Sequence, residues 1–313
     1  MKVVFFGTPP FAATVLEFLM KHQVEVLAVV TKPDKPQGRS GKPRPSAVKN
    51  LALSEYPDIP LFQPEEASAL SFIETLRPFK ADLFIVVAYG EIVQENLLQM
   101  PRLGCINVHA SLLPKYRGAA PMQFALLNGD KETGVTIIEM VKKMDAGDII
   151  AKKIVPISDS MNLEILEEEL CRAGCEMLLQ VIGEFEEGKV QKVMQDHEQA
   201  TYVKKIDPAM ARIDWKQPAQ VLHNRIRAFS PKPGAWCQIK IGGQTKRMKI
   251  LKSCVIPNRS GPPGEPLLYD KNSWVIACGQ DSLQLLEIQL EGKKRLEIEV
   301  FLRGHPEPPS IQV

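Results

Sequence analysis

The sequence predicts an α/β protein in which an open, mainly parallel β-sheet domain is followed by a small β-barrel. The first 150 residues alternate short apolar strands with helical stretches, which is the order expected of a parallel sheet covered by helices. Near the C-terminus, short alternating runs separated by Gly and Pro replace this order, as in a small barrel. A chain of 313 residues has room for about two such domains.

The expected strands of the sheet domain are short and mostly apolar. Residues 24–30 and 83–87 form nearly continuous apolar runs, as strands buried on both faces of a sheet require. Strands are expected at residues 2–6, 24–31, 82–88, 105–108 and 134–140. Helices are expected at about residues 10–22, 46–56, 65–77, 118–128 and 160–187. The last helix has a leucine-rich stripe opposite Glu164, Glu167 and Glu168, which is typical of an amphipathic helix.

The composition changes after about residue 200. A polar stretch and a short helix at about 218–229 lead to the sequence Ser-Pro-Lys-Pro-Gly at 230–234, which breaks the chain. Short strands are expected beyond it, at residues 235–241, 247–253, 275–278 and 282–289. The predicted division is therefore a catalytic domain at 1–203, followed by a linker and barrel domain at 204–313.

The two halves of the chain differ in charge. Residues 1–200 contain 21 basic and 27 acidic residues, a net charge of −6, whereas residues 201–313 contain 18 and 10, a net charge of +8. A basic half indicates a polyanionic partner, because Lys and Arg supply most of the affinity for phosphate backbones that does not depend on sequence. A basic domain that is merely soluble remains the alternative.

Cysteine spacing and hydropathy indicate a soluble cytoplasmic protein. The chain has no run of 18 apolar residues and begins without a signal-peptide pattern, so no membrane partner is expected. The six cysteines are scattered without a Cys-x-x-Cys pair, as in a reducing compartment. Cys171 and Cys175 lie four residues apart, but without a nearby His they indicate core positions, and no metal is expected. No feature reveals the oligomeric state, and we expect a monomer.

A basic loop follows the second expected strand. Residues 32–49 contain four prolines and two glycines, which prevent regular structure across most of the segment. A cationic loop at the ligand end of an acidic domain suggests an arm that closes over an RNA backbone. A solvated, flexible insertion is the alternative. The cations are Lys32, Lys35, Arg39, Lys42, Arg44 and Lys49.

The strongest chemical signal is the pair Asn107 and His109. Side chains two residues apart on a strand point to the same face, so these two aim at one place. An amide that donates hydrogen bonds beside an imidazole that donates or carries charge is suited to stabilise an oxyanion on a carbonyl carbon. A structural histidine is the alternative reading.

A carboxylate is expected beside this histidine, because it would orient the ring and favour its protonated form. Asp145 and Asp148 both follow the strand at 134–140, in a loop that we expect at the same rim of the sheet. Spacing alone does not choose between them.

Several common motifs are absent. Gly7 is the only glycine in the turn after the first strand, so the dinucleotide pattern G-x-G-x-x-G is missing. The chain also lacks the hydrolase elbow G-x-S-x-G, a phosphate-binding loop and the zinc motif H-E-x-x-H. An Asn, His and Asp set without a side-chain nucleophile suits a reaction in which the substrate brings the attacking atom, such as acyl transfer to an amine.

At these residues the chain resembles the tetrahydrofolate-dependent formyltransferases, and the resemblance covers nearly its whole length. It is carried by the segments 6–9, 32–49, 107–114 and 116–121 and by the loop around Asp145. Many relatives have Gly-Leu-Asp-Thr-Gly in that loop, where this chain has Lys-Met-Asp-Ala-Gly. The resemblance implies an α/β fold with a Rossmann-like, mainly parallel sheet domain followed by a small OB-like β-barrel domain.

The resemblance also implies residue roles and partners. It implies 10-formyltetrahydrofolate as the formyl donor and the α-amine of methionyl initiator tRNA as the acceptor, which would attack the formyl carbon directly. Asn107 and protonated His109 would hold the oxyanion, and Asp145 would keep His109 charged and aligned. The remaining residues that it assigns are Ser111, Leu112, Leu113 and Pro114 for folate and Arg39, Lys42 and Arg44 for tRNA, with Arg39 as the main functional cation.

Two alternatives stay open. Another formyl-folate enzyme, which formylates a small amine or hydrolyses the carrier, would share the catalytic set. The basic loop and the basic barrel favour RNA over a small amine. A nucleic-acid-binding protein without activity would explain the charge but not Asn107, His109 and Asp145. Lys246, Arg247, Lys249 and Lys252 are candidate barrel contacts to RNA, although their spacing also fits a solvated face.

Overall fold

The computed structural model describes residues 1–36 and 41–312, which form two compact units. The first unit comprises Met1–Pro121, Thr133–Pro156 and Glu167–Val203. The second comprises Met122–Glu132, Ile157–Leu166 and Lys204–Val313. Two short segments of the first 203 residues therefore pack with the C-terminal part of the chain. The assignment of catalysis to residues 1–203 and of RNA binding to residues 204–313 stays a prediction.

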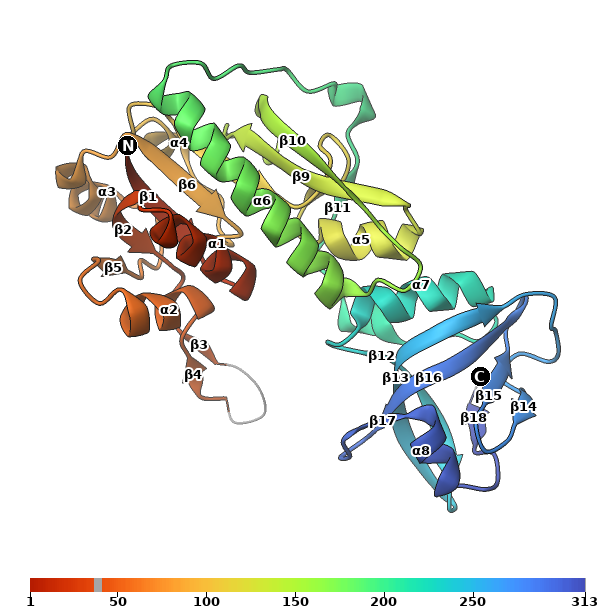
Figure 1. Ribbon diagram of the computed structural model, residues 1–313. Coiled ribbons are helices and arrows are strands. Elements are labelled where there is room, and N and C mark those ends of the chain that lie inside the picture. Colours follow the sequence, from red (N-terminus) through yellow and green to blue (C-terminus); the bar gives the residue numbers. More distant parts are fainter. Residues whose placement is uncertain (37–40, 313) are drawn as a thin grey trace. The chain divides into compact units, whose positions relative to one another are not determined.

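A seven-stranded sheet forms the centre of the first unit (Figure 1). The strands lie in the order β10-β9-β7-β6-β1-β2-β5, and the five from β7 to β5 are parallel. Strand β9 runs antiparallel to β7. The prediction of a mainly parallel sheet is confirmed. The strands are β1 Lys2–Gly7, β2 Glu25–Val30, β5 Leu61–Phe62, β6 Leu83–Val87, β7 Cys105–His109, β9 Glu132–Glu139 and β10 Ile149–Pro156.

Helices pack against the apolar side chains of this sheet. On one face, Phe72 and Leu97 of α3 and α4 join a core with Phe6 and Phe84. Helix α6 lies against β7 and β9, where a Cβ on Gly174 would stand 3.3 Å from Val108 and 3.5 Å from Val135. The helices formed by the first 186 residues are α1 Pro10–Lys21, α2 Ala47–Glu55, α3 Leu70–Leu76, α4 Glu95–Leu98, α5 Pro121–Asn128 and α6 Leu163–Glu186, with a 3₁₀ turn at Arg77–Phe79.

Two small strand pairs lie outside the main sheet. Strands β3 and β4 pair antiparallel within the basic loop, and β8 and β11 pair in parallel. Their bounds are β3 Lys35–Pro36, β4 Pro43–Arg44, β8 Arg117–Gly118 and β11 Tyr202–Val203. The second pair joins the segment after Asn107 and His109 to the segment that follows α6.

The second unit contains a curled, antiparallel sheet of seven strands, which confirms the small barrel-like domain. Its hydrogen-bonded path runs β14-β15-β16-β13-β12-β18, with β17 paired to β16. Among the described residues this path leaves β14 and β18 at its two edges, so the sheet forms a half-barrel. Its elements are a 3₁₀ turn at Pro208–Ala211, α7 Ala219–Phe229, β12 Ala235–Ile241, β13 Gln244–Ile256, β14 Pro266–Tyr269, β15 Trp274–Ala277, β16 Ser282–Leu290, β17 Arg295–Glu297, α8 Ile298–Arg303 and β18 Ser310–Gln312. A further 3₁₀ turn, His197–Gln199, belongs to the first unit.

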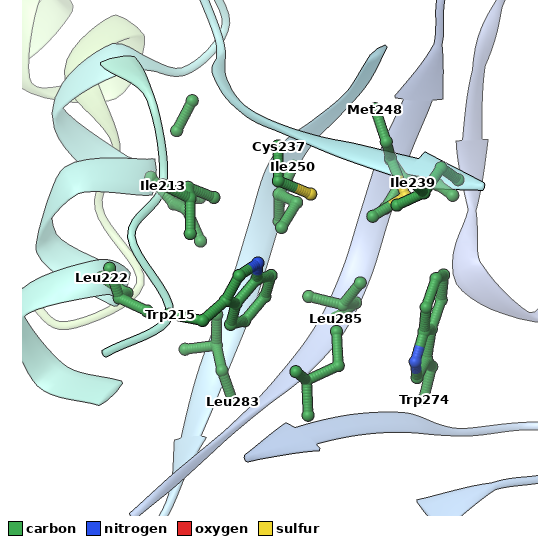
Figure 2. Packing of buried hydrophobic residues seen from close by; sticks show 14 of the residues in the cluster. Ile213, Trp215, Leu222, Cys237, Ile239, Met248, Ile250, Trp274, Leu283 and Leu285 are labelled. Atoms are coloured by element: carbon green, nitrogen blue, oxygen red, sulfur yellow. The ribbon is translucent and has the colours of Figure 1, made fainter. Parts of the chain in front are cut away.

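The core of this half-barrel contains large apolar side chains (Figure 2). Trp215 and Trp274 are fully buried among residues of the sheet, such as Ile250 and Leu285, and α7 contributes Leu222. Each fully buried Leu or Ile side chain of this core is worth about 1.5 to 3 kcal/mol relative to its exposed state. The core therefore explains why the C-terminal half folds as a unit of its own despite its charge.

A buried histidine holds one segment of the second unit. His223 of α7 is 6% exposed, its Nε2 lies 3.0 Å from the Asp159 carbonyl oxygen, and its Nδ1 lies 3.1 Å from Ser253 Oγ. Because a carbonyl only accepts, Nε2 carries the proton, and Nδ1 accepts from the serine hydroxyl. Burial lowers the pKa of His223, so the folded unit favours the neutral ring.

Acid should therefore weaken the second unit. The unfolded chain binds a proton at His223 below about pH 6.5, whereas the folded unit does so only at lower pH. The stabilisation from neutral His223 is complete above that pH and is lost as the pH falls below it. All three tryptophans lie in this unit, so their fluorescence in urea unfolding at pH 7.5 and pH 5 reports on it. The pH dependence should shrink in His223→Gln and persist in His22→Gln; an equal dependence in both variants would contradict this role.

No described helix is long and apolar enough to cross a membrane.

Candidate active site

Asn107 and His109 lie on β7, as predicted, and project from the same face of the strand. Asn107 is half-buried beside Val86 and Ile138 in the register, and His109 is 6% exposed. Within residues 1–36 and 41–312, the Asn107 side chain makes no hydrogen bond. Its two N–H groups are therefore available to a ligand.

The His109 ring is held on both sides. Its Nε2 lies 3.0 Å from the carbonyl oxygen of Tyr116, and its Nδ1 lies 3.8 Å from Asp145 Oδ1. The carbonyl can only accept, so the neutral ring carries its proton on Nε2. Protonation of the ring would then place the second proton on Nδ1, facing the carboxylate. A separation of 3.8 Å is too long for a hydrogen bond, so the contact is electrostatic in this structure.

Asp145, rather than Asp148, lies beside His109. Its second oxygen, Oδ2, accepts a hydrogen bond of 2.8 Å from the Gly118 amide, which fixes the direction of the carboxylate. Among the described residues Asp148 forms no ion pair with His109, and its backbone carbonyl accepts from the Glu139 amide at the base of the loop. Two carboxylates that spacing could not separate are therefore distinguished by their contacts.

The predicted location of this loop was wrong in one respect. Because β9 is antiparallel to β7, its end lies beside the beginning of β7, where the Met140 amide donates to the Cys105 carbonyl over 2.8 Å. The loop thus leaves the sheet at the opposite end from His109, and Asp145 nevertheless comes within reach of the ring. Asp145 is therefore close to His109 as expected, but not because the loop and His109 lie at the same rim of the sheet.

The segment predicted to contact folate is anchored to the protein. Ser111 and Leu113 are fully buried, and Ser111 Oγ donates to the Lys115 carbonyl over 2.6 Å. Thr136 Oγ donates to the Ser111 carbonyl and accepts from the Leu113 amide, which fixes the backbone. The side chains of Leu112 and Pro114 remain partly exposed. These two residues are therefore accessible from outside the segment, whereas Ser111 and Leu113 are not.

The basic loop has a fixed base. Lys32 forms an ion pair with Glu91, and Lys49 pairs with Asp34 at 2.9 Å. Hydrogen bonds from Gln63 and Lys49 lower the pKa of Asp34, so its carboxylate stays charged. Lys32 and Lys49 therefore hold the base of the loop in place. The sequence alone did not distinguish these two cations from the other four cations of the loop.

The remaining described cations of this loop are on its surface. Lys35 and Arg44 are directly opposed across β3 and β4, and both are exposed, as is Lys42. Like charges in directly opposed positions repel each other, and a bound anion would relieve this repulsion. Arg39, the predicted main cation, lies outside the described residues.

An aromatic and cationic cluster lies on the half-barrel. The Arg247 guanidinium is 4.0 Å from the centre of the Trp236 ring, and the Arg212 guanidinium is 6.0 Å from it. Lys249 is opposite Trp236 in the pairing of β12 and β13, whereas its neighbours in the strand, Met248 and Ile250, are buried. Arg247 and Lys249 thus share an outward face, while Lys246 is opposite buried Ile239 and Lys252 lies at a register shift.

The cysteines take no part in this site. In the part of the chain that the structure describes, all six are free thiols, and burial raises the pKa of Cys237 to about 12. Cys171 and Cys175 are buried in α6, and the Cys171 thiol lies 3.8 Å from the Phe11 carbonyl oxygen. Among the described residues, no group of three or more His, Cys, Asp or Glu side chains could hold a metal ion.

Comparison with known proteins identifies the family. The Formyl transferase family matches residues 1–182, and its C-terminal domain family matches residues 205–306. A protein of Protochlamydia amoebophila named methionyl-tRNA formyltransferase is 52% identical over 304 residues, covering 97% of this chain and 95% of that protein.

Solved structures share the fold at lower identity. An N-formyltransferase from Helicobacter canadensis, bound to folinic acid and dTDP-3-aminofucose, superposes with a TM-score of 0.65 at 20% identity, covering 95% of this chain and all of that one. HypX from Aquifex aeolicus, bound to tetrahydrofolic acid, gives 0.65 at 17% identity, covering 96% of this chain and 47% of that chain. The matches over both parts of the sequence and the close relative are decisive, and this chain belongs to the formyl transferase family.

Proposed function

We propose that this enzyme transfers the formyl group of 10-formyltetrahydrofolate to the α-amino group of methionine on initiator tRNA. The named relative at 52% identity supports both the reaction and the acceptor, because it matches nearly the whole of both chains. The single observation that carries the proposed chemistry is the placement of His109 between the Tyr116 carbonyl and Asp145, with Asn107 on the same face of β7.

The amine itself is the nucleophile in this reaction. The α-amino group has a reference pKa of about 7.7 to 8.0, so a useful fraction is free base at neutral pH. It attacks the formyl carbon on N10 of the folate, and the carbonyl oxygen becomes an oxyanion on a tetrahedral carbon. No side-chain nucleophile is required, which agrees with the absence of hydrolase motifs.

Asn107 and His109 would stabilise this oxyanion. The Asn107 amide has two N–H donors without a partner among the described residues, and protonated His109 supplies positive charge. Donors that are already oriented before the reaction favour the transition state over the ground state. Asp145, held by the Gly118 amide, would keep the imidazole oriented.

The proton balance assigns a second task to the same residues. When the C–N10 bond breaks, the electron pair returns to N10, which takes up a proton, while the attacking nitrogen loses one. A single net proton therefore moves from the amine to N10. His109 can mediate this transfer directly or through water, because its Nδ1 exchanges a proton while Nε2 stays bonded to Tyr116.

The contacts to both substrates are part of the proposal. Partly exposed Leu112 and Pro114 would contact the folate through their side chains, and the backbone from Ser111 to Leu113 is pre-arranged by Thr136. The arm around Arg39, Lys42 and Arg44 would contact tRNA phosphates. The Trp236 and Arg247 stack provides a second cationic surface suited to RNA. We further propose that the enzyme acts in the cytoplasm, since its substrate is an intermediate of translation initiation, and that it is a monomer.

Loss of a cation from the basic arm should weaken tRNA binding in a salt-dependent way. Arg44→Ala should reduce the slope of log K against log salt by about 1 if Arg44 neutralises one phosphate. Equilibrium binding of methionyl initiator tRNA at several salt concentrations measures this slope. Arg77→Ala, which removes an exposed cation paired with Glu74, is the matched control. An unchanged slope in the Arg44 variant would remove this residue from the interface.

The acceptor is tested by offering the enzyme several amines. With 10-formyltetrahydrofolate as donor, methionyl initiator tRNA, glycinamide ribonucleotide and an amino-sugar nucleotide are compared by rate of product formation, with donor loss in their absence as the measure of hydrolysis. Formylation of the tRNA alone supports the proposal. Preference for a small amine or for water would replace it with the corresponding enzyme, and RNA binding without any reaction would leave a binding protein.

A further inference from the structure

A buried glutamine connects two parts of the candidate active site. Gln195 lies in the irregular segment between α6 and β11 and is 3% exposed. Its amide nitrogen donates to the carbonyl oxygens of Asp145 and Gly147, over 2.9 and 2.7 Å. Its amide oxygen accepts from Arg117, with 2.6 Å to Nη2 and 3.3 Å to Nε. Every hydrogen-bonding group of the side chain is thereby used.

Arg117, the partner of this glutamine, is an unusual buried cation. It is fully buried, and in the described parts of the chain its guanidinium forms no ion pair with a carboxylate. Its other contacts are neutral, with Tyr202 Oη at 3.1 Å and His197 Nδ1 at 2.9 Å. A buried charge is costly unless its hydrogen bonds are satisfied, so this arrangement depends on good geometry.

The choice of an amide at position 195 is informative. A glutamate would compensate the charge of Arg117 better, but its carboxylate could not donate to the carbonyls of Asp145 and Gly147. Only a side chain that accepts on one side and donates on the other joins Arg117 to this loop. The carbonyls of the loop therefore explain why position 195 carries an amide, which Arg117 alone would not require.

Asp145 needs such support. Its φ of 51° lies in the left-handed region, which a residue with a Cβ adopts at some cost in energy. The two bonds from Gln195 fix the backbone on both sides of Ala146, and the Gly118 amide fixes the carboxylate. Since Gly118 follows Arg117 directly, the same short strand supports Asp145 through its backbone and through Gln195.

We propose that Gln195, braced by Arg117, is a positioning residue that sets the location of the Asp145 carboxylate relative to His109. The proposal rests on the proposed function, in which Asp145 orients His109. The segment after α6 would thus affect the reaction through the hydrogen bonds of Gln195 to the backbone carbonyls of Asp145 and Gly147.

The first test is Gln195→Glu, which keeps the size of the side chain and the bond to Arg117. It should lower kcat by roughly 10 to 100-fold, because a misplacement on the order of 1 Å can cost about 100-fold in rate. The KM values for folate and tRNA should change little, since the Gln195 side chain is buried and its hydrogen-bonding groups are all used within the protein. Gln199→Glu makes the same charge change at an exposed position of the same segment and should leave kcat unchanged.

A double-mutant cycle separates positioning from general structural support. If Gln195 acts through Asp145, adding Gln195→Glu to Asp145→Asn should reduce kcat little further. If the two losses multiply, Gln195 acts independently of Asp145 and the proposal is overturned.

Hydrogen exchange of the free protein tests, without any substrate, whether the hydrogen bonds from Gln195 hold the Asp145 loop. Gln195→Glu should increase exchange of the amides at residues 141–148 and leave the half-barrel unaffected. Unchanged exchange in this loop would contradict the proposal that Gln195 positions it. Exchange that increases throughout the chain would show a general loss of stability and would contradict the proposal equally. A wild-type protein that forms no formyl-methionyl-tRNA would instead refute the proposed function, while the exchange result would still decide the role of Gln195.

Discussion

Replacement of His109 by alanine should lower the rate of formyl transfer by roughly 1,000-fold or more. Electrostatic stabilisation of an oxyanion contributes about 100 to 1,000-fold, and a positioned group that donates and accepts a proton adds about 100 to 10,000-fold. His109 has both tasks in the proposed mechanism, and its buried ring is fixed between the Tyr116 carbonyl and Asp145. Single-turnover kinetics with saturating donor isolates this step from product release.

The affinities for tRNA and for folate should stay nearly the same in this variant, because neither depends on the charge of one buried ring. His22→Ala, at an exposed histidine of the same unit, is the control and should retain full activity. A loss of less than about 10-fold in His109→Ala would assign the ring a structural role, since one positioned donor alone is worth more.

Asn107 should show the second large effect, and two substitutions at this position make it specific. Asn107→Ala removes the donors and should cost about 100 to 1,000-fold in rate. Asn107→Asp has nearly the same shape but brings negative charge to the developing oxyanion, so it should be slower than the alanine variant. Single-turnover rates of both variants measure this order.

The order of these two variants is the decisive result. A carboxylate that is worse than a methyl group indicates negative charge at this place in the transition state. An aspartate variant that is faster than the alanine variant would instead mean that Asn107 fills space or contacts a cationic part of a substrate.

Much of the first sheet could be predicted because its central strands are buried on both faces. The run at 83–87 is entirely apolar and the run at 24–30 contains only Glu25 as a polar residue, and the observed β2 and β6 differ from the predicted bounds by only one residue at each end. Strand β10 was not predicted, because its edge position leaves Lys152 and Lys153 exposed within it. The short elements β14 and α8 were missed as well, since four and six residues are too few for a clear periodicity.

The site was only partly predictable, for a similar physical reason. Asn107 and His109 are two residues apart on one strand, so their common face follows from the sequence. Asp145 and Asp148 could be separated only by contacts, and the antiparallel direction of β9 was not visible in its composition. Gln195 was missed because it binds backbone carbonyls 48 and 50 positions away, and a carbonyl oxygen is present in every residue.

The most direct test of the account is a single-turnover reaction with donor labelled in the formyl group. Wild-type enzyme should transfer the label to methionyl initiator tRNA in one phase, without labelled protein at any time, because the amine attacks the donor directly. His109→Ala should slow that phase by roughly 1,000-fold. Label that appears on the protein before the tRNA, or that is released as formate while the tRNA stays unmodified, would contradict the account.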